Sequence, residues 1–402
     1  MPLFFIIVVV VLALMYTYAG RRLIRPARLN KFWRTLCWSA VYLCVLLPVL
    51  PFFLHVTGVE TEWIDYVSWA GFISMGFFLL LFTLLVTRDL LALVSRLALW
   101  TKRLIAPKPA SNPGPKAVVN SERRRFLIHT TNLGILSLSA SLAGYGLWEA
   151  RRRPRVFEVT IPLPGLPGEF DGFRIGQITD IHAGPTVKRD WIQEVVDETN
   201  RQAPDLIAFT GDLVDGSVPY LREDVAPMAE LTAPHGTYSV TGNHEYYSGA
   251  ESWIEEMNRI GLTVLMNQHV VIQRGAAQML LAGVTDYTAG GFIPSHQSDP
   301  HAALAGAPPC NPKVLLAHQP VSIYAASEAG YHLQLSGHTH GGQFFPGNML
   351  ARLAQPYISG LHKHENTWIY VSRGTGYWGP PLRLGQPSEI TIVTLRKSPQ
   401  PT

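Results

Sequence analysis

The sequence predicts a chain of two parts, with apolar membrane-spanning helices over residues 1–150 and an α/β domain over residues 151–402. Composition supports this division, because the chain is 47% hydrophobic and only 15% charged, whereas a soluble globular chain carries about 25% charged residues. The charge deficit lies mainly in the first 150 residues. From about Val156, short apolar runs alternate with stretches of helical spacing, a pattern typical of an α/β sheet protein.

Four stretches of the first part are long enough to cross a bilayer. They contain no Asp, Glu, Lys or Arg, and a helical crossing takes about 20 apolar residues. They run over Met1–Gly20, Thr35–Val59, Tyr66–Thr87 and Phe126–Trp148. The fourth stretch is rich in Ser, Thr and Gly, so a buried helix of a soluble domain is the alternative interpretation for it.

The charges of the connecting segments predict the orientation of these helices, because Lys and Arg concentrate in cytoplasmic loops. The first and third connections are basic, whereas the second holds Glu60, Glu62 and Asp65 and no Lys or Arg. We therefore expect an integral protein of the cell (inner) membrane whose α/β domain is extracytoplasmic. The domain would instead be cytoplasmic if the fourth stretch does not span, and the arginines just after it favour that alternative.

A segment before the fourth stretch, Glu122–Leu127, resembles a twin-arginine export signal. A basic flank of a membrane helix explains the same residues. Both interpretations place the following domain outside.

Charge and cysteine content exclude two other classes of protein. The net charge is +4, and much of the Lys and Arg lies beside the apolar stretches rather than on the domain, so we expect a bilayer and no nucleic acid as partner. Cys37 and Cys44 lie in an apolar stretch and Cys310 stands alone, which excludes a disulfide framework within the domain. Nothing in the sequence indicates the oligomeric state.

In the second part, short apolar runs predict strands, and two polar stretches with helical spacing, Asp190–Asn200 and Glu251–Ile260, predict helices. The predicted strands are Phe173–Ile178, Asp205–Phe209, Gly236–Val240, Val264–Met266, Met279–Ala282, Val314–Ala317 and His332–Leu335.

Polar residues follow five of these strands. The five segments are Asp180-Ile181-His182, Gly211-Asp212, Gly242-Asn243-His244-Glu245, His318, and Gly337-His338-Thr339-His340. One such residue would be explained as a helix cap or a turn former, but five in sequence are not. Because the carboxyl ends of adjacent strands meet in one crevice of an open α/β sheet, we expect these side chains to converge.

The donor types predict a metal site. Carboxylate oxygen, amide oxygen and imidazole nitrogen together favour Mn, Fe or Zn, whereas an all-oxygen set would favour Mg or Ca. Asp180 and His182 are two residues apart, so an extended or turning backbone can offer both to one ion. His338 and His340 have the same spacing and could serve neighbouring ions. No cysteine takes part, which disfavours a structural zinc site.

The order Asp-x-His, Gly-Asp, Gly-Asn-His-Glu, His, Gly-His-x-His resembles the calcineurin-like metallophosphoesterases, over residues Phe173 to about Ile392. The architecture of the N-terminal part is similar to the transmembrane subgroup of that superfamily. The resemblance implies a domain of two packed mixed β-sheets flanked by helices. It also implies hydrolysis of phosphate esters with two divalent metal ions.

The resemblance assigns a role to each motif residue. Asp180, His182 and His340 would hold the first ion, Asp212 would bridge, and Asn243, His318 and His338 would complete the second site. His244 would bind no metal, and would stabilise transition-state charge or protonate the leaving group. Two cations would neutralise the phosphate oxygens and lower the pKa of a water, so no phospho-enzyme is expected.

Other residues leave alternatives open. Asp215 and Glu245 either orient a histidine or are solvated loop charges. Arg373 and Arg383 lie in a Gly/Pro-rich segment and could contact the phosphate, or have no such role. Residues 284–311 form either a lid over the substrate or an ordinary mobile surface excursion.

The function we expect is a membrane-anchored phosphodiesterase or phosphatase that hydrolyses a phosphate ester or pyrophosphate. A lipid-linked substrate, such as the nucleotide-sugar lipid UDP-diacylglucosamine, is one candidate, although its cytoplasmic location counts against it for an extracytoplasmic domain. The alternative is a catalytically inactive membrane sensor or scaffold, which the complete ligand set disfavours. A transporter is disfavoured because the four stretches hold no Asp, Glu, Lys or Arg.

Overall fold

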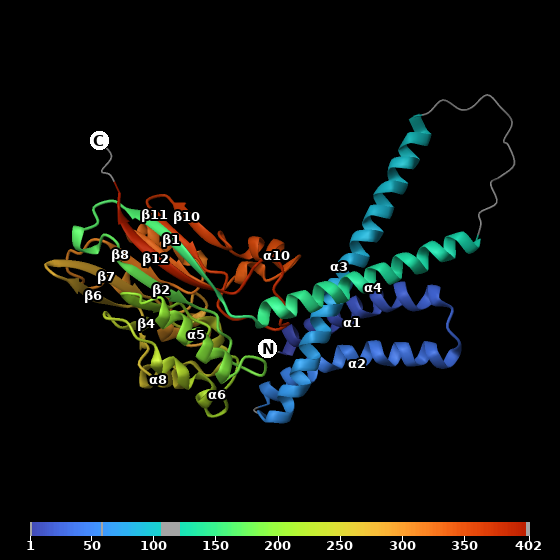
Figure 1. Ribbon diagram of the computed structural model, residues 1–402, viewed down its shortest axis with the longest axis horizontal. Coiled ribbons are helices and arrows are strands. Elements are labelled where there is room, and N and C mark those ends of the chain that lie inside the picture. Colours follow the sequence, from blue (N-terminus) through green and yellow to red (C-terminus); the bar gives the residue numbers. More distant parts are fainter. Residues whose placement is uncertain (1, 58, 106–120, 399–402) are drawn as a thin grey trace. The chain divides into compact units, whose positions relative to one another are not determined.

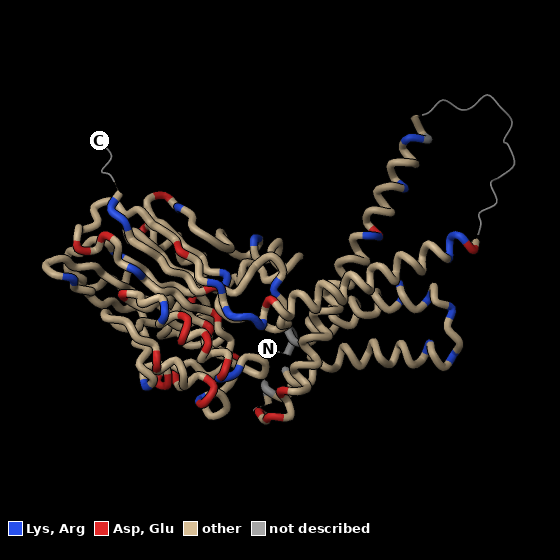
Figure 2. Tube along the Cα trace, in the orientation of Figure 1, with Lys and Arg blue, Asp and Glu red and all other residues tan. Residues whose placement is uncertain are grey.

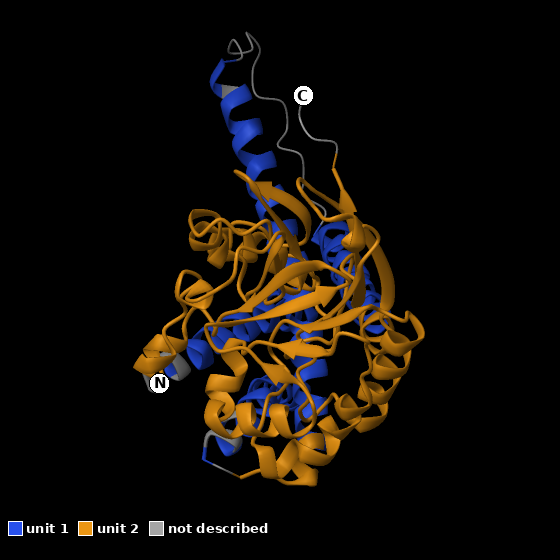
Figure 3. Ribbon diagram, turned by 90° about the vertical axis from the view of Figure 1, so that its left-hand side faces the viewer, with its two compact units in different colours: residues 1–58, 66–145 blue, residues 59–65, 146–402 orange. Residues whose placement is uncertain are grey.

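The structure is a computed structural model that describes residues 2–57, 59–105 and 121–398. It divides into two units (Figure 3). The first comprises Met1–Gly58 and Tyr66–Tyr145, and the second comprises Val59–Asp65 and Gly146–Thr402. The connection between the second and third helices and the last turns of the fourth helix therefore belong to the second unit.

The first unit consists of long apolar helices (Figure 1). They are α1 (Pro2–Ala27), α2 (Lys31–Val56), α3 (Glu62–Ile105) and α4 (Ser121–Arg151). Each is long and apolar enough to cross a membrane, with candidate spans Ile6–Ala27, Lys31–Pro51, Glu62–Lys102 and Ser121–Arg151. The expectation of apolar N-terminal helices is confirmed, and α3 continues well past the predicted end at Thr87.

The helices of this unit carry few charged residues (Figure 2), and some of those charges pair with one another. Asp89 of α3 accepts a hydrogen bond from Tyr18 Oη at 2.5 Å and forms an ion pair with Arg22 of α1 at 2.5 Å. The neighbouring Arg88 donates to Asn132 of α4 at 2.6 Å. A charge inside an apolar helix unit is costly unless it is paired, so this network ties α1, α3 and α4 together.

The second unit contains two six-stranded mixed sheets. The first sheet has the order β1-β12-β2-β3-β4-β5, with β1 (Arg155–Leu163), β2 (Arg174–Ile178), β3 (Leu206–Phe209), β4 (Thr237–Ser239), β5 (Thr263–Val264) and β12 (Glu389–Lys397). The second has the order β10-β11-β9-β8-β7-β6, with β6 (Gln268–Arg274), β7 (Ala277–Gly283), β8 (Lys313–Leu316), β9 (Leu333–Ser336), β10 (Gly360–His364) and β11 (Thr367–Val371).

The two sheets pack face to face around a shared core. Ile175 of β2, Leu281 of β7 and Leu335 of β9 belong to one buried cluster between them. Ile178 lies three residues after Ile175 and therefore points to the opposite face, where it joins a cluster formed with the flanking helices. Burial on both faces explains why the predicted strands read as continuous apolar runs.

Helices and a long connection cover the outer faces. The helices of this unit are α5 (Arg189–Arg201), α6 (Val218–Val225), α7 (Asn243–Ser248), α8 (Ala250–Arg259), α9 (Ile323–Glu328) and α10 (Gly347–Ala354), of which α10 has no buried residue. Trp191 of α5 and Trp253 of α8 pack on the first sheet. Ala303 and Cys310, from the connection 284–311, pack on the second sheet. The predicted fold class, two mixed sheets flanked by helices, is confirmed.

Candidate metal centre

The polar residues predicted at strand ends lie at one edge of the two sheets. Strands β2, β3 and β4 run parallel in the first sheet, and β8 and β9 run parallel in the second. Each is followed directly by part of the motif, so the carboxyl ends deliver these side chains to the same place. The motif residues are buried or half-buried: Asp180, His182, Asp212, Asn243, His244, His318, His338 and His340.

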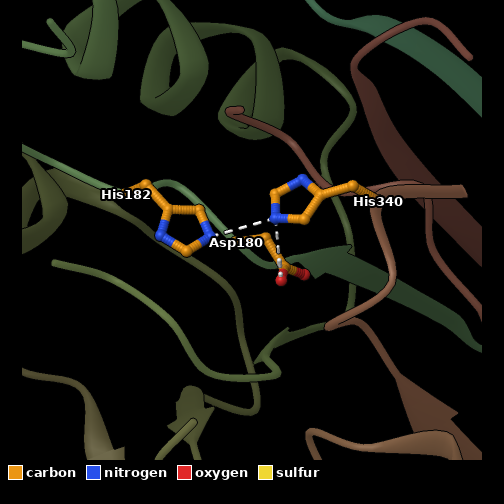
Figure 4. Close-up of side chains that lie close together, drawn as sticks. All are labelled: Asp180, His182 and His340. Carbon is orange, nitrogen blue, oxygen red and sulfur yellow. Dashed lines mark hydrogen bonds and ion pairs between the residues drawn. The ribbon is translucent and has the colours of Figure 1, made fainter. Parts of the chain in front are cut away.

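One group of possible ligands consists of Asp180, His182 and His340 (Figure 4). The Nε2 atoms of the two histidines lie 3.0 Å apart, and His340 Nε2 lies 3.5 Å from Asp180 Oδ1. Asp215 accepts a hydrogen bond from His182 Nδ1 at 3.1 Å. This bond leaves the lone pair of His182 on Nε2, the nitrogen that faces the group.

A second group consists of Asp212, His318 and His338. His318 Nε2 lies 3.1 Å from Asp212 Oδ2 and 3.2 Å from His338 Nδ1. His318 Nδ1 donates to the carbonyl of Thr210 at 2.8 Å, so Nε2 is the nitrogen that faces the group. Asp212 Oδ2 also lies 3.7 Å from His182 Nε2. One carboxylate therefore stands between the two groups.

The backbone at these residues is strained. Asp180, His182, Asp212, His338 and His340 have positive φ values of 54°, 53°, 58°, 72° and 50°. A non-glycine residue in this left-handed region costs roughly 1 kcal/mol or more, and such residues cluster at functional sites. Five of them at one sheet edge indicate that the fold holds these side chains against a local energetic preference.

Two glycines of the motifs are required by close approach. A Cβ atom at Gly242 would lie 2.1 Å from Asp212 Oδ1, and one at Gly337 would lie 2.1 Å from Asp180 Oδ2. Any side chain at either position would displace a carboxylate of the site. The glycines that accompany Asn243 and His338 in the sequence thus leave room for the acidic ligands.

His244 forms a third group of possible ligands with His182 and Asp212, and it also contacts Asp215. Its Nδ1 is 2.5 Å from Asp215 Oδ1, and its backbone N–H donates to Asp212 Oδ1 at 2.9 Å. Burial lowers the pKa of His244, but the carboxylates of Asp212 and Asp215 outweigh this effect and raise the pKa to about 9. The rings of Tyr247 and Trp378 lie 5.1 and 5.6 Å away.

The structure shows the surroundings of Glu245, for which the sequence left two alternatives open. It is fully buried and accepts hydrogen bonds from the backbone N–H groups of Asp212, Leu213 and Gly242 at 3.1, 2.7 and 2.6 Å. The loops after β3 and β4 are therefore joined through one carboxylate. Glu245 is not a solvated loop charge.

Two arginines considered as phosphate contacts are engaged by the protein. Arg383 is fully buried, donates from Nη1 to the carbonyl of Arg373 at 2.7 Å, and has its Nη2 atom 3.1 Å from His340 Nδ1. Arg373 forms an ion pair with Glu389 at 2.6 Å. A substrate phosphate cannot reach a side chain without exposed surface, so that role is wrong for Arg383, which instead supports the loop of His340.

The donor set fits divalent cations. Burial lowers the pKa of His340 and lowers that of His338 to about 3, so both imidazoles are neutral, as ligands must be. Asp212 and His318 act on each other as an ion pair: burial is outweighed in both, so the pKa of Asp212 is lowered by His318 and the pKa of His318 is raised by Asp212. A cation bound by these two residues would replace the proton of His318. The buried Oδ1 atom of Asn243 has no hydrogen-bond partner among the residues that the structure describes. A cation between the two groups would satisfy that oxygen.

Comparisons with known proteins identify the family of this chain. The family model for calcineurin-like phosphoesterase matches residues 173–342. A transmembrane protein with metallophosphoesterase domain from Danio rerio is 35% identical over 377 residues, covering 90% of this chain and 81% of that protein. An uncharacterized metallophosphoesterase of Helicobacter pylori is 39% identical over 281 residues, covering 68% of this chain and 72% of its own.

Among solved structures, the chain is similar to a calcineurin-like phosphoesterase from Bacillus subtilis, with 16% identity and a TM-score of 0.32. That match covers 50% of this chain and 88% of the other. None of these three descriptions names a substrate.

Proposed function

Since the chain belongs to the calcineurin-like metallophosphoesterase family and is a metal-dependent phosphoric ester hydrolase, we propose that its site holds two divalent ions and that His244 acts on the substrate. In this proposal Asp180, His182 and His340 hold one ion, Asp212 is shared, and Asn243, His318 and His338 hold the other. The mixed nitrogen and oxygen donors favour Mn, Fe or Zn. We place the catalytic domain at residues 151–402.

The observation that carries the proposal is the shared position of Asp212. Its Oδ2 atom lies within 4 Å of an imidazole nitrogen of each group, 3.7 Å from His182 Nε2 and 3.1 Å from His318 Nε2. A single ion would leave one of the two groups unused. When bound, two ions would supply charge neutralisation on the phosphate and activation of a water.

The protein's own contribution to the reaction is proton placement. His244 Nδ1 is bound to Asp215, so its other nitrogen, Nε2, remains for the substrate. Its imidazole can stabilise charge on the phosphate or give a proton to the leaving group. Asp215 fixes this ring and the ring of His182 at the same time.

Hydrolysis of simple esters tests the proposal. We expect the purified full-length protein to hydrolyse bis(p-nitrophenyl) phosphate or p-nitrophenyl phosphate with Mn or Zn, and to lose activity in EDTA. His244→Ala should lower turnover by about 100-fold or more while leaving bound metal unchanged. A His244→Ala protein as active as the wild type would refute the assigned role.

Contacts inside the second unit support a proposal about the side of the membrane on which the site lies. In the α2–α3 connection, Glu60 accepts a hydrogen bond from the backbone N–H of Ser217 at 3.0 Å, and Asp65 forms an ion pair with Lys188 at 3.1 Å. Tyr220 donates to Asp65 as well. These contacts support a location of this connection and the catalytic domain on the same side of the membrane.

Two points on the same side are separated by an even number of crossings. Between the α2–α3 connection and the domain lie α3 and α4, so both cross or neither does. Because the first and third connections are basic, we infer that the catalytic domain is extracytoplasmic. Labelling of Ala276→Cys, an exposed hairpin position, by a membrane-impermeant maleimide in intact cells tests this; labelling only after lysis would contradict it.

A further inference from the structure

Helix α10 (Gly347–Ala354) presents an apolar surface that is largely exposed. None of its residues is buried, in the part of the chain that the structure describes. Met349, Leu350 and Leu353 are 58%, 63% and 85% exposed, and Phe345, just before the helix, is 51% exposed. Met349 and Leu353 are four residues apart and share a face of the helix. Contiguous exposed apolar residues of this kind mark interaction sites.

This surface, which we define as Phe345, Met349, Leu350 and Leu353, adjoins the metal centre. The helix follows the loop of His340 after a short connection, and Gly347 N donates to the carbonyl of Phe344 at 2.7 Å. A Cβ atom at Gly342 would lie 2.2 Å from Asn348, so the start of α10 packs directly on that loop. Whatever binds the surface therefore lies beside the catalytic site.

The same part of the unit contains the end of α4, a membrane-span candidate. Trp148 is 56% exposed, and the guanidinium of Arg152 lies 5.0 Å from the centre of its ring. Arg151, Arg153 and Arg155 follow within the next residues. A Trp followed by several arginines is typical of the point at which a helix leaves the hydrocarbon and enters the lipid headgroups.

Backbone hydrogen bonds connect this end of α4 with the loop that leads into α10. Arg383 N donates to the carbonyl of Gly146 in α4 at 3.0 Å. The next residue, Leu384, donates its N–H to the carbonyl of Gln343 at 2.9 Å. Gln343 in turn exchanges two side-chain hydrogen bonds with the backbone of Trp378, at 2.8 and 3.0 Å. The α10 surface is thus continuous with the part of the unit that emerges from the membrane.

We propose that α10 is an interfacial helix, whose apolar surface inserts into the boundary between headgroups and acyl chains of the bilayer that α4 crosses. A bilayer fits better than a protein partner, because α4 holds the domain at the lipid surface permanently. Exposed Arg352, on the same helix, suits the phosphates of lipid headgroups. The surface thereby holds the loop of His340 at the membrane.

This arrangement has a consequence for the substrate, which rests on the proposed phosphoesterase function. A metal centre beside an inserted helix can reach a phosphate at headgroup depth. A phosphate ester whose alcohol is embedded in the membrane is therefore the favoured substrate class, over an ester dissolved in water.

Depth-dependent quenching tests the insertion directly. The full-length chain, with Cys37, Cys44 and Cys310 replaced by Ala, would carry one cysteine labelled with a nitrobenzoxadiazole dye, at Leu353→Cys or at the control position Ala276→Cys. Both proteins would be placed in phosphatidylcholine nanodiscs whose acyl chains carry a doxyl quencher. We expect strong quenching at position 353 and little at position 276. Equal quenching at the two positions would overturn the proposal, whether or not the protein is active.

A substrate comparison tests the consequence. The quantity compared is the turnover rate of phosphatidic acid in nanodiscs divided by the turnover rate of soluble p-nitrophenyl phosphate. We expect Leu350→Ser/Leu353→Ser to lower this ratio several-fold. Tyr324→Ser, which replaces an exposed aromatic residue on α9, should leave this ratio as it is. An unchanged ratio in the double variant would contradict the preference. Absence of turnover on both esters with metal present would instead count against the phosphoesterase function.

Discussion

The residues that do chemistry here were predictable because they are adjacent in sequence to the ends of apolar runs. Asp180, Asp212 and His318 each follow a buried strand, and their side chains converge as that position implies. The supporting residues were not predictable to the same degree. Arg383 contacts the loop of His340 although it lies 43 residues later in the sequence. No periodic pattern of the sequence predicts such a contact.

Glu245 provides a stability test at a single carboxylate. Its replacement by Ala leaves three buried backbone N–H groups without acceptors, and we expect a loss of about 3 kcal/mol or more. The thermal unfolding midpoint of the full-length protein should fall clearly in Glu245→Ala. Glu251→Ala, at an exposed position in the first turn of α8, is the matched control. Equal midpoints for both variants would show that Glu245 does not join the two loops.

Asp215 provides a metal-affinity test. Because its carboxylate orients His182, whose other nitrogen faces the ligand group, Asp215→Asn should weaken metal binding by about 10- to 100-fold. Competition with a fluorescent chelator measures this affinity, and Asp171→Asn, at an exposed site, serves as control. Affinity equal to that of the wild type would assign Asp215 to His244 alone.

At the level of helices and strands, the buried strands that carry the motifs were predicted, and of the edge strands only β5 overlaps a predicted range. The strands β2, β3, β7, β8 and β9 lie close to their predicted ranges, as do helices α5 and α8. The strands β1, β6 and β10 are partly exposed, so they lack the continuous apolar run that marks a central strand. Strand β11 is largely buried and has such a run, and it was missed all the same. Strand β12 is buried but belongs beside β1 and β2, more than 200 residues earlier, a pairing that only tertiary structure supplies.

The junction of β8 and β9 has a pH-dependent contact. His332 Nδ1 accepts a hydrogen bond from the backbone N–H of Lys313 at 3.1 Å, and burial, followed by the charge of Lys313, lowers the pKa of His332. The folded state therefore favours the neutral ring. This contribution to stability is complete above the unfolded pKa, about 6.5, and is lost as the pH falls towards and through the folded pKa.

The expected result is a fall in the unfolding midpoint between neutral pH and about pH 5 that is smaller in His332→Gln than in the wild type. Other histidines titrate in both proteins, so the difference between the two curves isolates His332. Parallel curves over that range would contradict the assignment.

For the whole molecule, composition indicated a membrane part and an α/β part, and the structure has four candidate spans and a unit of two sheets. From loop charge alone, the side of the membrane on which the domain lies depended on whether the fourth apolar stretch spans. The contacts of Glu60 and Asp65 with Ser217 and Lys188 add a constraint that sequence could not supply, because the residues of each pair are more than 120 positions apart. The apolar surface of α10 was not predicted either, because the helix has only eight residues and is too short to stand out as an apolar stretch of the sequence.

The metal content of the purified full-length protein tests the central claim most directly. After dialysis against Mn or Zn, mass spectrometry of the metal should give two ions per chain for the wild type, and a lower value with loss of ester hydrolysis for Asp212→Asn, whose shared carboxylate lies between the two groups. Hydrolysis at wild-type rates by a protein holding one ion or none, or by Asp212→Asn, would contradict a site in which two ions share Asp212.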